Sequence, residues 1–186
     1  IRDRNTNYFI EFRKLKTILT IFEKRVSTKD LPFFMKLMYG LSNLNIVCPK
    51  PIKSKKGSYL FKIKNKNACI VTFLKGNDKK QLTPSDCKQI GKNVAELHKA
   101  TKKLKINRKN SLSIKELPKI LKKIDNRINK FSRNLKVSMN LDLKNLSIYW
   151  PKNLPKGVIH SDLFIDNIFF YKKKSVSYTH LTLPTT

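Results

Sequence analysis

A short polar segment between two apolar runs constrains the fold of this chain most strongly. It reads His160-Ser-Asp-Leu-Phe-Ile-Asp-Asn167, with Val158–Ile159 before it and Ile168–Phe170 after it. Apolar β-branched and aromatic residues on both sides predict a strand, a loop and a second strand. The loop would then present a histidine, a carboxylate and an amide at fixed spacing.

The spacing His160-x-Asp162-x-x-x-x-Asn167 is that of a kinase catalytic loop. In phosphoryl transfer a carboxylate accepts the proton of the attacking hydroxyl, and a nearby amide oxygen holds a magnesium ion that bridges the nucleotide phosphates. Such chemistry depends on positioning and on charge neutralisation. The alternative is a surface turn between two strands, in which Asp162 and Asn167 are ordinary turn formers.

The charge of the chain raises a second function class. At 186 residues the chain suggests one domain or two small lobes, and its formal charge is +29. Of the 41 basic residues 7 are Arg and 34 are Lys, and they are spread along the sequence. Abundant Lys, Asn and Ile indicate AT-rich coding, and the aromatic residues are not interleaved with Arg as base-stacking platforms. A basic nucleic-acid-binding protein therefore stays open as the less favoured interpretation.

The cysteine content and the hydropathy of the chain indicate the cellular compartment. The three cysteines, Cys48, Cys69 and Cys87, show no C-x-x-C spacing, which indicates thiols in a reducing cytoplasm rather than metal ligands or disulfides. No apolar run is long enough to predict a membrane span, and no signal-peptide pattern opens the chain. The first residue is Ile rather than Met, so we expect the start to be a fragment edge.

The first 75 residues carry strand patterns. Alternating apolar residues predict strands over 5–12 and 17–22, joined by a turn at Arg13-Lys14. Further strands are predicted over 58–63 and 68–74, the second of them continuously apolar. Together these segments predict an antiparallel sheet.

One helix is predicted to cross this sheet. Thr28 or Asp30 can serve as its N-cap, Pro32 suits its first turn, and Gly40 to Asn43 mark its end. Helical spacing places five apolar residues on one face: Phe33, Phe34, Leu37, Met38 and Leu41. We expect this face to pack on the sheet.

The rest of the chain is predominantly helical in pattern. Thr83 caps a predicted helix over 84–98, and a basic linker over 99–110 follows. Helical periodicity returns over 114–131, and the stretch 134–146 favours a further helix. The fold class predicted is therefore α+β with two lobes, an antiparallel small lobe with one helix and a mainly helical large lobe.

The last eleven residues differ from the rest. All 41 basic and 12 acidic residues lie in the first 175 positions, and Val176 to Thr186 contain none. This peptide resembles a translated transposase sequencing adapter. We expect residues 176–186 to be a non-native tail.

Several strings of the sequence resemble the homoserine kinases of the aminoglycoside phosphotransferase and choline kinase-like, protein-kinase-like superfamily. The loop His160–Asn167 is typical of the superfamily, and Asp-Leu-Phe-x-Asp-Asn within it is similar to the homoserine branch. The other matching strings are Asn5–Tyr8, Leu19–Glu23, Asp30–Phe34, Cys48–Pro51 and Ile90–His98. The resemblance implies an incomplete protein-kinase-like fold, with a nucleotide-binding lobe at 1–75 and a helical lobe at 76–175 that holds the catalytic loop at 157–170.

The reaction implied by the resemblance is transfer of the γ-phosphoryl group of ATP to the hydroxyl of L-homoserine, giving O-phosphohomoserine for threonine biosynthesis. Asp162 then occupies the position of the catalytic base, and His160 that of the histidine that buttresses the loop. Asn167 occupies the position of a Mg²⁺ ligand. No membrane partner is implied. A choline or aminoglycoside kinase of the same fold is the nearest alternative.

The nucleotide site implied by the resemblance has one conventional part and several departures. Thr72, Phe73 and Leu74 map to the hinge that meets the adenine. Thr20 stands where many relatives have a phosphate-pairing Lys or Arg, and Ser161 stands where Gly is usual. A Gly-rich turn before Asn5 and a second metal-binding Asp after the last strand are missing. We therefore expect this polypeptide to be nearly inactive and the complete gene product to be an active kinase, with a pseudokinase as the remaining alternative.

Overall fold

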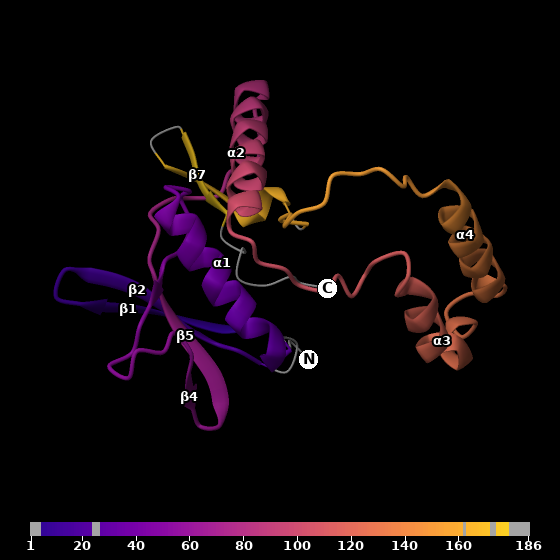
Figure 1. Cartoon of the computed structure of the whole chain (residues 1–186), viewed down its shortest axis with the longest axis horizontal. Helices are drawn as coiled ribbons and strands as arrows, with labels where there is room; N and C mark the ends of the chain where they lie inside the picture. Colours follow the sequence, from indigo (N-terminus) through magenta and orange to yellow (C-terminus); the bar gives the residue numbers. More distant parts are fainter. Residues whose placement is uncertain (1–4, 24–26, 162, 172–173, 179–186) are drawn as a thin grey trace. The chain divides into compact units, whose positions relative to one another are not determined.

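The computed structural model describes residues 5–23, 27–161, 163–171 and 174–178 (Figure 1). The described residues fall into two compact units, one drawn from 5–107 and 157–178 and the other from 108–156. The first unit combines an antiparallel sheet with helices, and the second is helical. The predicted α+β class is confirmed.

The sheet of the first unit is antiparallel throughout and has the order β1-β2-β5-β3, with β4 also pairing with β5. Arg13 takes a positive φ of 55° in the predicted turn between β1 and β2, which gives the tight reversal of a hairpin. The bounds are Thr6–Phe12 for β1, Leu15–Ile21 for β2, Pro51–Ile52 for β3, Phe61–Ile63 for β4 and Lys66–Thr72 for β5. The sheet predicted from sequence is confirmed.

The predicted strand over 58–63 is wrong in its first half. The Ser58 hydroxyl donates to the carbonyl oxygen of Leu60 at 2.7 Å and accepts from the Leu60 N–H at 3.2 Å. This local pairing replaces the ladder hydrogen bonds that a strand would need. Strand pairing therefore begins only at Phe61.

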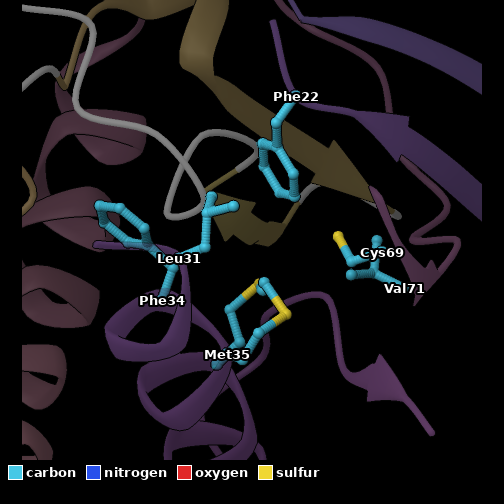
Figure 2. Close-up of a cluster of buried hydrophobic side chains, with 7 residues drawn as sticks. Phe22, Leu31, Phe34, Met35, Cys69 and Val71 are labelled. Atoms are coloured by element: carbon cyan, nitrogen blue, oxygen red, sulfur yellow. The ribbon is translucent and has the colours of Figure 1, made fainter. Parts of the chain in front are cut away.

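Helix α1 (Leu31–Asn43) begins after Asp30, has Pro32 in its first turn and buries one face. Figure 2 shows the cluster that this face forms with the sheet: Phe22, Leu31, Phe34, Met35, Met38, Cys69 and Val71. Four residues of the predicted stripe are buried and Phe33 is half-buried. Full burial of a Met or Leu side chain contributes about 1.5–3 kcal/mol, so α1 anchors the sheet.

Helix α2 (Pro84–Lys103) begins with the predicted cap at Thr83, which forms a capping box with Asp86. The basic linker predicted from residue 99 is wrong in its start, because the helix runs on to Lys103. Its last turns bury Ala100 and Thr101, and the terminal lysines suit the negative end of the helix dipole. Ala100 and Leu97 pack with three residues outside α2: Leu37, Leu41 and Cys48.

The segment predicted as a catalytic loop ends in a hairpin that packs on α2. A short 3-10 turn, Ile165–Asn167, leads into β6 (Ile168–Tyr171), which pairs with β7 (Lys174–Tyr178). Ile168 and Phe170 form a cluster with Ile90 of α2. Residues 176–178, which the sequence assigns to a non-native tail, lie in β7, and residues 179–186 lie outside the described residues.

The second unit contains α3 (Leu117–Ile128) and α4 (Leu135–Tyr149), which contact each other. Both helices were predicted, and α3 begins with a proline in its first turn. Within the described part of the chain, no helix has the length and apolar character needed to cross a bilayer.

The capping box of α2 is expected to make the stability of the fold depend on pH. The hydrogen bond from Lys79, followed by those from Thr83, lowers the pKa of Asp86 from its ordinary value of 3.8 to about 2. Because the pKa is lower in the folded chain, the carboxylate stabilises the fold above about pH 4, and this stability is lost as the pH falls through about 2. We expect Asp86→Asn to lower the melting temperature at pH 7. Its difference from wild type should shrink between pH 4 and 2 in thermal unfolding followed by circular dichroism, and a constant difference would contradict this account.

Candidate active site

Apolar contacts hold the loop at 157–167 near its start and at Leu163. Val158 and Leu163 pack against the cluster that includes Leu97, and the hydroxyl of Thr101 donates to the carbonyl of Val158 at 3.4 Å. The strand predicted at Val158–Ile159 is wrong, because among the described residues this segment is extended without a strand partner. Packing on α2, rather than sheet pairing, therefore positions the start of the loop.

The backbone at Ser161 shows why glycine is the usual residue at this position of the loop. It takes a φ of 57°, a left-handed conformation that glycine adopts without strain and that other residues adopt less readily. The structure thus places a serine in a backbone conformation that favours glycine. His160, directly before it, is half-buried, whereas Asp162, directly after it, lies outside the described residues.

Asn167 ends the 3-10 turn and is only 8% exposed. Its backbone N–H donates to the carbonyl of Phe164 at 2.9 Å, and the next residue, Ile168, is a buried residue of β6. An amide side chain is therefore held at the start of an otherwise apolar strand. Its carbonyl oxygen is the kind of hard ligand that Mg²⁺ takes, so this residue fits the predicted metal role in its chemistry.

Thr20 lies in β2 and is 7% exposed, opposite Asn7 of β1 and Cys69 of β5. Its hydroxyl donates to the Asn7 side-chain oxygen at 2.7 Å. The hydroxyl is thus committed to a neighbouring strand, while Asn7 itself is exposed. This bond turns the amide nitrogen of Asn7, with its two N–H donors, away from Thr20.

The predicted hinge continues β5. The Thr72 N–H donates to the Lys50 carbonyl at 2.9 Å, and the Phe73 N–H donates to the Lys16 carbonyl at 3.0 Å. These two donors are used within the sheet. The Phe73 ring meets the Phe9 ring edge to face, with 5.1 Å between the ring centroids, and Leu74 follows beyond the strand.

Asn7 and Phe9 were not singled out as site residues from sequence. Cross-strand pairing places Asn7 with Thr20 and Cys69, and Phe9 with Ile18 and Val71. Since paired residues share a sheet face, both lie on the face that α1 covers elsewhere, and both are exposed. An amide and an aromatic pair thus line an uncovered margin of that face. The Asn5-Thr-Asn-Tyr8 string was the available signal for Asn7.

Comparison with known proteins identifies the family. Residues 3–177 match the family described as "Phosphotransferase enzyme family". The chain belongs to this family. The match includes the sheet, both units and the loop from His160 to Asn167.

Curated homoserine kinases are among the relatives of this chain. The homoserine kinase of Agrobacterium fabrum is 36% identical over 166 residues, which are 89% of this chain and 52% of that protein. The homoserine kinase of Paramagnetospirillum magneticum is 36% identical over 171 residues, which are 92% of this chain and 52% of that protein. The chain spans about half the length of the curated relatives it matches.

Solved structures share the fold at low identity. An amicoumacin kinase in complex with AMP-PNP and Ca²⁺ superimposes with a TM-score of 0.72 at 18% identity, covering 97% of this chain and 57% of that one. A spectinomycin phosphotransferase in complex with ADP and spectinomycin gives a TM-score of 0.66 at 16% identity, covering 95% and 59%. These likenesses confirm the predicted kinase-like fold.

Proposed function

We propose that the protein is a homoserine kinase, which transfers the γ-phosphoryl group of ATP to the hydroxyl of L-homoserine. The observation that carries the substrate is the 36% identity to a curated homoserine kinase over 89% of this chain. The buried amide of Asn167 beside the packed loop supports the class of reaction. The product would be O-phosphohomoserine.

In this proposal Asp162 receives the proton of the homoserine hydroxyl on its carboxylate as the oxygen attacks the phosphoryl group. His160, which is half-buried, would hold the loop backbone in place. Asn167 would hold Mg²⁺ through its amide oxygen, since it is buried and fixed by the preceding 3-10 turn. The ion, when bound, supplies charge neutralisation at the phosphates.

The nucleotide is proposed to lie against the uncovered margin of the sheet. Backbone groups at Thr72, Phe73 and Leu74 would meet the adenine. Because the N–H groups of Thr72 and Phe73 are used within the sheet, Leu74 is the best placed to donate. The amide of Asn7, oriented by Thr20, would donate to the phosphates in place of the cation that many relatives carry.

The proposal also includes the division into lobes and a cytoplasmic localisation. Residues 1–75 would form the nucleotide-binding lobe and residues 76–175 the helical lobe, with residues 176–186 as a non-native tail. Cys48 and Cys69 are free and buried, and burial raises the pKa of each thiol to about 12, so both are poor nucleophiles. This suits a cytoplasmic protein in which Cys48 and Cys69 take no part in the chemistry.

A substrate panel tests the proposal. We expect ADP release that depends on both Mg²⁺ and L-homoserine when the reading frame containing residues 1–175 is expressed at the length of its relatives. Choline, an aminoglycoside and L-serine are the matched acceptors, and buffer alone measures ATP hydrolysis. Faster turnover with choline or the aminoglycoside would show that homoserine is not the preferred substrate and would assign the protein to that other class of kinase. ADP release at the same rate with every acceptor and with buffer alone would contradict a kinase assignment.

A further inference from the structure

The segment that follows the predicted hinge lies against β6. The Asn77 N–H donates to the Phe170 carbonyl at 3.1 Å, and the Phe170 N–H donates to the Asn77 carbonyl at 2.9 Å. A Cβ placed on Gly76 would meet the Cβ of Phe169 at 2.9 Å and the Phe170 carbonyl oxygen at 3.2 Å. Glycine at this position therefore permits the close approach, because any larger residue would push the segment from the strand.

The Lys79 side chain also contacts Phe170 of β6, and it forms an ion pair with Asp86. Its ammonium nitrogen lies 2.7 Å from a carboxylate oxygen of Asp86 and 4.4 Å from the centroid of the Phe170 ring. The Lys79 side chain is 34% exposed and the Asp86 side chain 8% exposed. Such partial burial makes both the ion pair and the cation–π contact stronger than at an open surface.

Asp86 is itself held in place at the start of α2. Its second carboxylate oxygen accepts from the Thr83 N–H at 3.0 Å and from the Thr83 hydroxyl at 2.9 Å. Both carboxylate oxygens are thus engaged, one by the helix cap and one by Lys79. The Lys79 ammonium is consequently fixed relative to α2. Its contact with the Phe170 ring holds that ring in place as well.

The position of Phe170 matters because it lies three residues after Asn167 in the same short segment. Ile168 and Phe170 are both buried, with the half-buried Phe169 between them, as expected for a strand with one buried face. The Phe170 ring packs with Ile90 of α2, and the Phe170 backbone pairs with Asn77. A shift of β6 away from these contacts would move Phe170 and the nearby Asn167 together.

We propose that Lys79 is a positioning residue for the metal ligand Asn167, acting through Phe170 of β6. This inference rests on the proposed function, because it assumes that Asn167 holds Mg²⁺. We define the contact among Lys79, Asp86 and Phe170 as the Lys79 clamp. It links the segment after the predicted hinge to the strand that follows the metal ligand, so its loss is expected to affect the metal site.

The test compares Lys79→Met, which keeps the aliphatic stem but removes the charge, with Lys79→Arg, which keeps the charge. Lys80→Met is the matched control, because Lys80 is the exposed neighbour. The protein at the length of its relatives is titrated with a fluorescent ATP analogue, first without metal and then over a range of Mg²⁺ concentrations. Hydrogen exchange of the Phe170 amide is followed in the same samples.

For Lys79→Met we expect the Mg²⁺ concentration at half-saturation to rise about tenfold, the lower range for losing an outer-shell partner of a metal site. Metal-free binding of the analogue should stay unchanged, and the Phe170 amide should exchange faster. Lys79→Arg should restore the Mg²⁺ response, and Lys80→Met should match wild type.

Two results would overturn the Lys79 clamp while leaving the proposed function intact. One is an unchanged Mg²⁺ response in Lys79→Met, and the other is an equal loss of binding with and without metal, which indicates a merely structural role. If the wild-type protein at the length of its relatives fails to bind the analogue with Mg²⁺ at all, the proposed function is contradicted and this inference falls with it.

Discussion

Asp162→Asn is expected to lower turnover of homoserine by roughly 10²–10⁴, the scale for losing a positioned general base. An amide at this position keeps the size of the side chain but cannot take the proton from the attacking hydroxyl. Because the effect is on the chemical step, kcat should fall while the KM for ATP changes little. Steady-state ADP release in the protein at the length of its relatives measures both constants.

Asp166→Asn is the matched control for this prediction. Asp166 lies in the same loop, within the 3-10 turn, and is exposed, so the same chemical change there should leave turnover near wild type. Normal turnover in Asp162→Asn, or an equal loss in both variants, would sink the assignment of the base. The first result would favour a surface turn at this loop.

Asn167→Ala is expected to produce the second large loss, about 10²-fold in kcat/KM at a fixed low Mg²⁺ concentration, at the upper range for disturbing a metal site. Removing the amide oxygen takes away a proposed ligand from a buried position. Raising Mg²⁺ should recover part of the activity, because the metal binds more weakly rather than not at all. A Mg²⁺ titration of turnover measures this recovery.

Asn167→Asp separates the metal role from a structural one. It keeps an oxygen ligand of similar size, so we expect it to use Mg²⁺ better than Asn167→Ala does. Thermal unfolding of both variants controls for lost packing, since the side chain is buried. An unchanged Mg²⁺ requirement in Asn167→Ala would count against the ligand assignment.

Local patterns predicted much of the first unit. The stripe from Phe34 to Leu41 reports which face of α1 is buried because burial follows the period of the helix. The alternation in β1 predicted the strand correctly, although its side chains from Asn7 to Phe12 are exposed. Thr83 was predictable as a cap because its hydroxyl satisfies an N–H of its own helix. These features depend on residues close together in the sequence.

The features that sequence reasoning missed depend on residues far apart in the chain. Thr20 and Asn7 meet through strand register, and Lys79 meets Phe170 only because β6 returns beside the segment after the hinge. The extension of α2 to Lys103 packs Ala100 against Leu37, Leu41 and Cys48 from outside the helix. No periodicity within one segment encodes such contacts.

Phosphorus NMR of the reaction products tests the central claim most directly. With Mg²⁺-ATP and L-homoserine, the account predicts a new phosphomonoester resonance coupled to the methylene protons next to the homoserine oxygen, growing as ATP is consumed. Inorganic phosphate alone would show hydrolysis without transfer. A phosphorylated product formed only with a different acceptor, or no consumption of ATP by the protein at the length of its relatives, would contradict the proposed function.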